Sequence, residues 1–589
     1  MIEILWLIIL ALGTLCIGRE IQRRIHPTTE PLLDILLSFA LGSGTLILVM
    51  YALGWLGWMR PLHVITTTAL LFVTTIRNIT WLLAAIRSLD YTWMRQKPML
   101  CAVFLAFAAL NLIGALAPTT DSDGLGYHLA IPKYYLESGG FAYHPMIVST
   151  WPLTTEMMYT LALAISGDVL AKLVHYAFGI LAALATYWLA RRLAGHDIGV
   201  LAAVIFYTIP LIAIESGIAY NDLAMTFYFV LGFGLWLSWI LDDVKGSFLA
   251  AAIVLGLFAS TKWNGPVSIM ILTLMTTWMK RSQLRMSLRQ IAGFVSITAS
   301  FSVMWYVKNW IINGNPLGPF AESLFDGVNW TVAHSLAYLA SVKSLDLSLS
   351  HFFLAPIKLF LMPSQYGELT FLGPILLMLA PIGFALWRTR ESLTILTFAA
   401  FSYVFWWATS QQSRLLIPIF TLLAIVSAQT AHDERLTRVR TPILCIILVS
   451  MLLNLAFPIA YHGKAVGYIL GVEDRDAYLE RIRPVYPAMQ YINTHTPPNS
   501  TVVMLGEIHA YWLLRPYLFE CAAMQGVINY EETPQEIYDR MKSMGVTHLL
   551  LNHNVPFCDG MEKKLAQEPF LGSLRPEFSR NNVEVVTLL

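Results

Sequence analysis

Charged residues are scarce in this sequence. Lys, Arg, Asp and Glu together make up 13% of its 589 residues, whereas about a quarter is usual in soluble proteins. Hydrophobic residues make up 57%. This balance excludes an ordinary soluble protein and indicates an integral membrane protein with many spans. The net charge of +1 gives no reason to expect nucleic acid as a partner, which would need a basic stripe.

Cysteine and the common catalytic loops are also rare. No Cys-x-x-Cys pair, Gly-rich phosphate loop or nucleophile elbow occurs in the hydrophilic C-terminal region. Cys16, Cys101 and Cys445 lie in apolar runs, where a thiol acts as a small core residue. Cys521 and Cys558 lie in the hydrophilic region, so they are the pair that can form a disulfide if this region faces an oxidising compartment.

Apolar runs long enough to cross a bilayer recur along most of the chain. We predict about 14 spans, at residues 2–18, 32–57, 63–87, 99–117, 168–192, 197–214, 223–241, 247–261, 264–279, 290–310, 370–387, 393–410, 414–430 and 441–461. Residues 152–166 are apolar but short, and together with parts of 311–369 they favour helices that lie along the membrane interface.

Basic residues collect in every second connection, as the positive-inside rule requires. These connections hold Arg19, Arg23 and Arg24; Arg87, Arg95 and Lys97; Arg191 and Arg192; Lys245; Lys280, Arg281, Arg285 and Arg289; Arg388 and Arg390; and Arg435, Arg438 and Arg440. This alternation predicts that both termini and the loop after residue 117 lie on the outer side of the membrane. In a bacterium the protein would then lie in the inner (plasma) membrane, with its termini in the periplasm.

The composition changes after residue 461, and 462–589 is predicted to be a soluble α/β domain on the outer side. Residues 501–507 and 547–554 have the pattern of buried strands. Residues 534–545 have helical spacing and end at a glycine. Because none of the phosphate-binding or nucleophile motifs occurs in this domain, we expect an accessory or acceptor-facing role.

The first long polar segment, 118–150, carries a group of ionisable residues directly beyond a predicted span. Asp121, Asp123, Tyr127, His128 and Lys133 follow directly after a span. Carboxylates at such a place can act as a general base toward a hydroxyl, or bind a divalent ion. The alternative is that Asp-Ser-Asp-Gly is a turn that caps the following helix. Likewise the histidine can shuttle a proton or simply be held by a neighbour, and the tyrosine can stack on a sugar or belong to the interface.

A second group of ionisable residues lies at outer span ends further along the chain. Glu215 ends one span and Asp222 begins the next, where Asn221 or Asp222 can equally be a helix cap. Lys262, Lys308 and Arg414 stand on the side where the positive-inside rule prefers no cation. Each can be a snorkelling side chain. Together they favour an anion at the interface, and a phosphate is the obvious candidate.

Several stretches resemble one family of membrane enzymes: DSDGLGYHLAIPKYYLESG, AYNDLAMTF, ASTKWNG, WYVKNWIINGNPLGPF, FLGPILLMLAPIGF and QSRLLIPIF. In this order they resemble the bacterial GT-C superfamily, in the group of the lipid A aminoarabinose transferase, protein mannosyltransferases and RgtA/B/C/D-like enzymes. The resemblance covers about 99–461, which it makes a GT-C-like catalytic core with outer loops 118–167 and 311–369. Residues 1–98, three extra N-terminal spans, and 462–589 are additions to it.

The resemblance implies a hexosyl- or pentosyltransferase that inverts the sugar. The donor would be a polyprenyl-phosphate-linked sugar, and the acceptor a hydroxyl of a glycan, lipid or protein on the outer face. Asp121 or Asp123 matches the first-loop catalytic base, Asp222 the second acidic site, and Lys262 and Arg414 the cations near the lipid phosphate. The other candidate substrate-binding residues are Tyr127, His128, Lys133, Glu215 and Lys308. No ligand spacing requires a metal, and Asp121 and Asp222 are the candidate ligands if Mg²⁺ or Mn²⁺ binds.

Two other functions fit a chain with this many spans. An O-antigen ligase or polymerase also uses a lipid-linked donor, but it would have a large basic outer loop, whereas this loop begins with acidic residues. A lipid or solute transporter would have ionisable residues near the midplane and internal repeats with broken helices. Here the acidic groups gather at one face and no repeat is evident, so the transporter is the more distant alternative.

Overall fold

A computed structural model describes residues 2–281, 284–342, 346–367, 371–520 and 532–589. The chain folds into two compact units, each assembled from three segments that are separated in the sequence. Unit 1 comprises 1–117, 152–304 and 344–466. Unit 2 comprises 118–151, 305–343 and 467–589.

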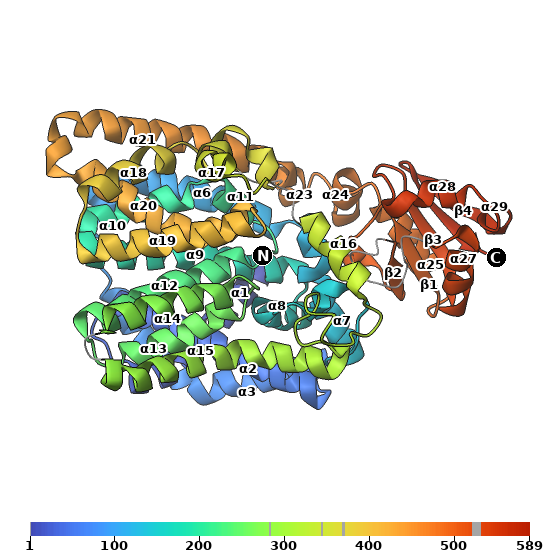
Figure 1. The fold of residues 1–589 in the computed structure, drawn as a ribbon, viewed down its shortest axis with the longest axis horizontal. Helices are drawn as coiled ribbons and strands as arrows, with labels where there is room; N and C mark the ends of the chain where they lie inside the picture. Colours follow the sequence, from blue (N-terminus) through green and yellow to red (C-terminus); the bar gives the residue numbers. More distant parts are fainter. Residues whose placement is uncertain (1, 282–283, 343–345, 368–370, 521–531) are drawn as a thin grey trace. The chain divides into compact units, whose positions relative to one another are not determined.

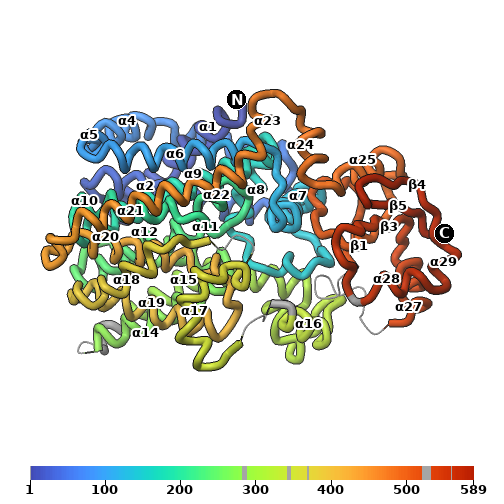
Figure 2. Tube along the Cα trace, turned by 90° about the horizontal axis from the view of Figure 1, so that it is seen from above, coloured from blue at the N-terminus to red at the C-terminus, as the bar shows by residue number. Residues whose placement is uncertain are grey.

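Unit 1 is a bundle of helices that run broadly along one direction, as Figures 1 and 2 both show. Its helices are α1 (Ile2–Ile25), α2 (Pro31–Leu56), α3 (Pro61–Thr75), α4 (Ile79–Arg87), α5 (Thr92–Gln96), α6 (Pro98–Leu116), α8 (Thr154–Ile165), α9 (Asp168–Ala194), α10 (His196–Tyr207), α11 (Pro210–Glu215), α12 (Asp222–Asp242), α13 (Ser247–Ala259), α14 (Gly265–Met279), α17 (Leu349–Leu361), α18 (Ile375–Leu386), α19 (Arg390–Ala408), α20 (Ile417–His432), α21 (Arg440–Asn454) and α22 (Ala456–His462). Helix α15 (Leu284–Asn313) begins in unit 1 and ends in unit 2.

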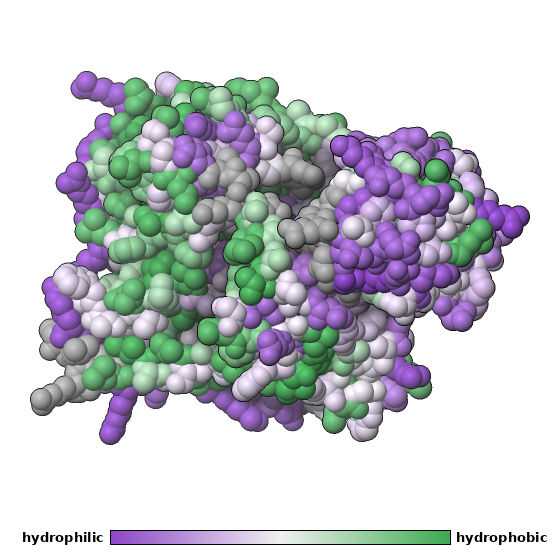
Figure 3. Space-filling view, turned by 45° about the vertical axis from the view of Figure 1, so that its right-hand side comes forward, coloured by the Kyte–Doolittle hydropathy of each residue, from purple (hydrophilic) through white to green (hydrophobic). Residues whose placement is uncertain are grey.

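The helices confirm the prediction of a polytopic α-helical membrane protein. Among the described residues, nine helices are long and apolar enough to cross a membrane, and five shorter apolar helices accompany them. Each of the predicted runs coincides with one helix or with consecutive helices. The surface over unit 1 is largely apolar, as expected where lipid tails surround it (Figure 3). The exact number of spans stays a prediction.

The N-terminal helices pack into the bundle through small residues. A Cβ atom on Gly18 would lie 1.6 Å from the carbonyl oxygen of Ser38, and one on Gly42 would lie 1.8 Å from that of Thr14. The backbones of α1 and α2 therefore touch, as small residues allow in membrane helix pairs. Helix α2 also contacts the rest of unit 1, because the Ser43 hydroxyl lies 2.9 Å from that of Tyr228 on α12.

Helix α12 lies at the centre of unit 1, and its burial explains its composition. Its residues from Asp222 to Trp239 are all buried, and it packs against α9, α13 and α20. A helix that is apolar on every side can be stable only when other helices or lipid surround it completely. Helix α8, predicted to lie along the interface, is buried from Thr154 to Ala162 and packs against α2, α3 and α9.

Ion pairs connect several of the basic connections that the sequence places on the inner side. Arg191 pairs with Glu30, and Lys97 pairs with Asp197 at 3.2 Å. The imidazole of His26 also lies 3.0 Å from the hydroxyl of Ser247. These contacts bring the connections after α1, α5, α9 and α12 to one end of the bundle, in agreement with the predicted alternation.

Unit 2 contains a mixed five-stranded sheet in the order β2-β1-β3-β5-β4. Its strands are β1 (Thr501–Leu505), β2 (Tyr517–Phe519), β3 (Val546–Asn552), β4 (Leu574–Arg580) and β5 (Val583–Leu588). Strand β1 pairs in parallel with β2 and β3, whereas β5 is antiparallel to β3 and β4. Its flanking helices are α24 (Arg475–Ile482), α25 (Tyr486–His495), α27 (Pro534–Ser543), α28 (Met561–Leu565) and α29 (Phe570–Ser573).

The sheet confirms the predicted C-terminal α/β region. Strands β1 and β3 and helix α27 lie where the sequence placed two strands and a helix. Helix α27 begins with a capping box between Thr533 and Glu536, and Gly545 follows its end with φ of +72°. The surface of this region is mostly hydrophilic (Figure 3). Cys558 is disulfide-bonded, and Cys521, its predicted partner, lies outside the described residues.

The first outer loop and the second outer segment meet within unit 2. Residues 118–151 form a π-helical turn (Gly124–His128), helix α7 (Ala130–Ser138) and a 3-10 turn (Ile147–Thr150), and 305–343 include helix α16 (Val332–Val342). The Thr150 hydroxyl donates to the Gly318 carbonyl at 2.9 Å. The two outer segments, which were predicted as separate loops, therefore belong to one compact unit with the C-terminal sheet.

Candidate functional site

The predicted catalytic carboxylates lie at the start of the first outer loop, where they differ in exposure. Asp121 is buried, with 2% of its surface exposed, whereas Asp123 is half-buried. The Tyr127 hydroxyl donates to Asp123 Oδ2 at 3.2 Å, one turn further along. Asp123 precedes the π-helical turn, but its side chain makes no capping hydrogen bond. Its carboxylate is therefore not explained as a helix cap.

Asp121 occupies space that the absence of a side chain on Gly124 leaves open. A Cβ atom at Gly124 would lie 1.9 Å from Asp121 Oδ2, which is far inside van der Waals contact. Two residues on, a Cβ atom at Gly126 would have the Ile508 carbonyl oxygen as its nearest neighbour, at an ordinary 3.6 Å. The π-helical turn thus holds the buried carboxylate over a glycine.

This packing predicts different results for two neighbouring glycines. Gly124→Ala should displace the Asp121 carboxylate. We expect it to lower the rate of a reaction that uses this loop by at least tenfold, because a shift of about 1 Å at a reacting group can lower a rate a hundredfold. Gly126→Ala, in the same turn, should change it less than threefold. Initial rates of both variants at equal amounts of folded protein check this. Equal rates for the two variants would show that the position of Asp121 does not matter.

Aromatic rings surround the other predicted residues of the turn. The Tyr127 and His128 rings lie 4.1 Å apart between centroids, and the Trp151 ring meets Tyr127 edge-on at 5.3 Å. His128 is fully buried. The Tyr127 ring is thus fixed between two other rings, and this fixes the hydroxyl that contacts Asp123.

Two of the predicted substrate-binding lysines donate to backbone carbonyls of unit 2. Lys133 Nζ donates to the carbonyls of Tyr511 and Leu513, both at 2.8 Å. Burial lowers its pKa, which the nearby Glu137 opposes. Lys308 is buried and donates to the Ser149 carbonyl at 2.6 Å. These ammonium groups hold the loop in place, and a role in binding phosphate stays a prediction for both.

A histidine and a glutamate of the C-terminal region reach the first outer loop, and sequence reasoning missed both. His509 Nε2 lies 3.0 Å from the hydroxyl of Ser122, the residue between the two aspartates. His509 Nδ1 pairs with Glu507. Both residues follow β1 in the stretch GEIHAYW. Their position after a predicted strand could have indicated a function, because polar residues at the carboxyl ends of parallel strands often form binding or catalytic sites.

In unit 1, the second acidic site forms a network at the start of α12. Asp222 is fully buried, and its carboxylate pairs with Lys262 Nζ at 2.5 Å. Asn221 donates from Nδ2 to Glu156 Oε1 at 2.8 Å and makes no cap. Instead His175 Nε2 accepts from the Leu223 amide at 3.3 Å. The capping alternative for Asn221 is therefore not observed. Glu156 was missed, although a lone carboxylate in an apolar helix is a signal for function.

Arg414 joins the same network through Tyr220. Its guanidinium lies over the Tyr220 ring at 5.4 Å from the centroid, and Tyr159 donates to the Tyr220 carbonyl. Two of the three outer cations, Lys262 and Arg414, thus contact the neighbouring residues 220 and 222. Glu215 is also buried in unit 1, at the end of α11.

Unit 1 contains a mostly apolar pocket, and some residues of its wall are close to these cations in the sequence. Its wall includes the aromatic rings of Phe229, Phe258, Phe398, Phe405 and Trp406, together with polar side chains such as Asn264 and Ser268. Asn264 is two residues from Lys262, and the wall residue Leu415 follows Arg414. The pocket wall thus includes residues that neighbour both cations in the sequence.

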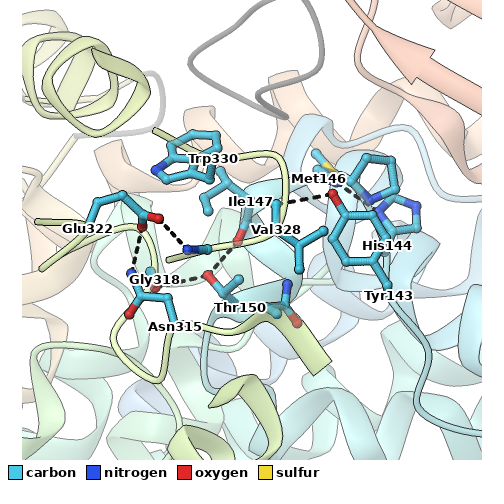
Figure 4. Close-up of a pocket in the computed structure, with 13 residues that line it drawn as sticks. Tyr143, His144, Met146, Ile147, Thr150, Asn315, Gly318, Glu322, Val328 and Trp330 are labelled. Carbon is cyan, nitrogen blue, oxygen red and sulfur yellow. Dashed lines mark hydrogen bonds between the residues drawn. The ribbon is translucent and has the colours of Figure 1, made fainter. Parts of the chain in front are cut away.

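A second pocket lies in unit 2 between the two outer segments (Figure 4). Tyr143, His144 and Thr150 come from the first segment, and Glu322 and Trp330 from the second. Figure 4 shows the Glu322 carboxylate turned toward the backbone and amide groups beside it, and it accepts from the Gly327 amide at 2.6 Å. Glu322 thus holds the second segment in its own conformation, whereas the hydroxyls of Thr150 and Tyr143 donate to carbonyls of that segment from the first.

His144 at this pocket is held as a neutral imidazole. Its Nδ1 accepts from the Met146 amide at 3.1 Å, and its Nε2 lies 3.1 Å from the Tyr517 hydroxyl. Burial lowers its pKa from 6.5 to about 3. A second proton on Nδ1 would face the Met146 N–H group, so the charged form fits the site poorly.

His144 should therefore make the protein sensitive to acid. The pKa of His144 is lower in the folded than in the unfolded protein. Its contribution to the free energy of unfolding is therefore fully present above pH 6.5. That contribution falls by up to about 1.4 kcal/mol per pH unit as the pH is lowered toward 3. His144→Gln should flatten the fall of the melting temperature between pH 7 and 4, whereas His495→Gln, at an exposed site, should not. Identical profiles for wild type and His144→Gln would contradict this.

No group of three or more His, Cys, Asp or Glu side chains is arranged to hold a metal ion within the part of the chain that the structure describes. Asp121 lies in unit 2 and Asp222 in unit 1. A divalent ion at either carboxylate stays a prediction.

Comparisons with known proteins place this arrangement in a fold class. The family model of the dolichyl-phosphate-mannose-protein mannosyltransferases matches residues 167–313, which include Glu215, Asp222 and Lys262. The structure of ArnT from Cupriavidus metallidurans bound to undecaprenyl phosphate is 15% identical, with a TM-score of 0.55, and the match covers 83% of this chain and 97% of ArnT. The chain has the GT-C fold of ArnT.

Two further solved structures are similar to this chain. The apo structure of the same ArnT matches over the same shares of both chains, at 15% identity and a TM-score of 0.52. The oligosaccharyltransferase AglB from Archaeoglobus fulgidus, in complex with an inhibitory peptide and a dolichol-phosphate, is 13% identical with a TM-score of 0.46, over 78% of this chain and 70% of AglB. No curated protein matches the sequence significantly.

Proposed function

We propose that this GT-C protein transfers a sugar from a polyprenyl-phosphate donor to an acceptor hydroxyl, with inversion at the sugar carbon. The reaction would take place at the periplasmic face of a bacterial inner membrane. The fold and the match to the mannosyltransferase model support an enzyme that uses a lipid-linked sugar. ArnT, which has the same fold, binds undecaprenyl phosphate. A hexose or pentose as the sugar, and a glycan, lipid or protein as the acceptor, are all compatible with this proposal.

The network around Asp222 is the observation that carries the proposal. Lys262, which is paired with Asp222, and Arg414 place two cations here, and wall residues of the apolar pocket lie within two residues of each in the sequence. A polyprenyl-phosphate-linked sugar has the complementary structure, a phosphodiester with one negative charge on an apolar chain, and the leaving polyprenyl phosphate gains a second. Cations at the phosphate would stabilise the negative charge that develops as the sugar leaves. The Asp222 carboxylate holds Lys262 in place before the donor binds.

Asp123 is the better candidate for the general base. A base must reach the acceptor hydroxyl, and Asp123 is half-buried whereas only 2% of Asp121 is exposed. In the proposed step the acceptor oxygen forms a bond to the anomeric carbon while the bond from that carbon to the phosphate oxygen breaks. Asp123 takes the acceptor proton, and the polyprenyl phosphate leaves with the bonding pair. Asp121 would shape the turn that presents Asp123.

The proposal is tested by following labelled sugar from polyprenyl-phosphate donors to a membrane extract, with the purified protein in liposomes. Wild type should transfer label, and the labelled product identifies the acceptor. Arg414→Gln should raise the KM for the donor at least tenfold, because it removes a charge-assisted contact to the phosphate. Arg435→Gln is the control, since Arg435 pairs with Asp433 near a predicted inner connection. No transfer by wild type from a full donor panel would exclude the proposed function.

A further inference from the structure

We propose that Glu507 and His509 of the C-terminal region are positioning residues for the catalytic turn, which they hold through Ser122. The inference rests on the proposed function, in which this turn carries the base. It makes the C-terminal region part of the active site, whereas the sequence suggests an accessory role.

The contacts of His509 link the sheet to the turn. Its Nδ1 pairs with the Glu507 carboxylate. Its Nε2 lies 3.0 Å from the Ser122 hydroxyl, within hydrogen-bond distance. One orientation of the Ser122 side chain is thereby selected. Because Ser122 stands between Asp121 and Asp123, its orientation is coupled to the backbone of both aspartates.

Glu507 is itself held rigidly, which a positioning role requires. Its Oε1 accepts from the backbone amides of Ile508 and His509, each at 2.8 Å, and its Oε2 accepts from Asn552 Nδ2 at 3.1 Å. Burial would raise its pKa, but the hydrogen bonds from His509 and from these amides outweigh burial, and the pKa lies below its usual value. Glu507 is therefore an ionised carboxylate that orients the imidazole ring.

The fold explains why these groups lie together. Strand β1 lies between β2 and β3 and runs parallel to both. Glu507 follows the carboxyl end of β1, and Asn552 is the last residue of β3. The carboxyl ends of adjacent parallel strands meet at one edge of a sheet, where side chains for binding and catalysis commonly gather. This edge faces the first outer loop, because a Cβ atom on Gly126 would lie 3.6 Å from the Ile508 carbonyl.

A second contact fixes the turn from its other side. Arg483 Nε donates to the Thr120 carbonyl at 2.7 Å, so the C-terminal region holds residues 120 and 122 on either side of Asp121. Displacement of a catalytic group by about 1 Å can lower a rate a hundredfold. Arg483 and His509 can therefore affect the rate through the position of the turn, without contacting substrate.

The test compares two amides at His509, because each can replace one ring nitrogen. In His509→Gln the amide can reach the position of Nε2 and keep the bond to Ser122. In His509→Asn it can reach only the position of Nδ1, so the bond to Glu507 remains and the bond to Ser122 is lost. We expect His509→Asn and Ser122→Ala to lower kcat tenfold to a hundredfold, and His509→Gln to retain at least a third of the wild-type kcat. The KM for the donor should stay within twofold in all three.

A readout independent of activity follows the turn directly. Hydrogen exchange of the peptide that covers 118–128 should become at least fivefold faster in His509→Asn and Ser122→Ala, but not in His509→Gln. The double variant His509→Asn/Ser122→Ala should match the single variants, because both remove the same bond. His548→Asn is the matched control, since His548 lies 3.7 Å from Glu577 in a similar pair on the same sheet. It should leave exchange of this peptide and kcat unchanged.

The outcomes separate this inference from the proposed function. Equal exchange in His509→Asn and wild type overturns the inference, as does faster exchange with unchanged kcat in an active enzyme. Equal losses in His509→Gln and His509→Asn show that His509 has only a structural role, and they also overturn it. If wild type transfers no sugar but exchange responds as described, the proposed function fails while the link between His509 and the turn stands.

Discussion

Asp123→Asn should lower kcat by about a hundredfold to ten-thousandfold, the range that general base catalysis supplies. The amide has the shape of the carboxylate but cannot accept the proton of an acceptor hydroxyl. Because the proposed donor contacts lie in unit 1, the KM for the donor should change little. Single-turnover transfer of labelled sugar from the polyprenyl-phosphate donor measures the chemical step and excludes effects on product release.

Two neighbouring variants make this result specific. Asp121→Asn keeps the volume that packs over Gly124, so we expect a loss of less than tenfold. Tyr127→Phe removes the hydroxyl that donates to Asp123, and one such hydrogen bond is worth about 1 kcal/mol, or roughly fivefold in rate. The assignment of the base would be reversed if Asp121→Asn were the inactive variant and Asp123→Asn retained transfer.

The sequence was sufficient for the parts of the fold that local composition determines. Hydropathy located the helices of unit 1, because a span must satisfy its backbone internally and expose apolar side chains to lipid. Strands β1 and β3 were found because buried parallel strands are short continuous apolar runs. The antiparallel strands β4 and β5 were not predicted. In β4 the reason is that residues 574–580 are largely exposed and include Pro576, and proline has a low propensity for strands.

The division of the chain into units could not be predicted, since it depends on contacts between distant segments. The resemblance placed residues 118–151 with the catalytic core, as part of an outer loop, and in the structure they pack with 467–589. The same limit applies to single residues. Lys308 was a candidate phosphate ligand by its place at a span end, but its ammonium donates to Ser149, which is distant in the sequence. Conversely, nothing local pairs His509 with Ser122.

The pair of Asp222 and Lys262 gives the other large expected effect, on stability as well as on activity. Asp222 is fully buried and the Lys262 side chain is 13% exposed. Removing one member of such a pair leaves the other charge buried without its partner, which typically costs about 3–5 kcal/mol. Asp222→Asn should therefore unfold at clearly lower denaturant in detergent micelles. Asp242→Asn, at the other end of α12, should change stability by less than about 1 kcal/mol, because Asp242 is 51% exposed.

The double variant Asp222→Asn/Lys262→Met separates the two roles that the proposed function gives this pair. The double variant leaves neither charge of this pair without its partner, so most of the stability lost in Asp222→Asn should return. Activity should not return, because the donor phosphate would still lack Lys262. A double variant that is both stable and active would remove Lys262 from the donor site. One as unstable as Asp222→Asn would mean that Asp222 stabilises α12 through contacts other than Lys262, and the electrostatic account of this network would be wrong.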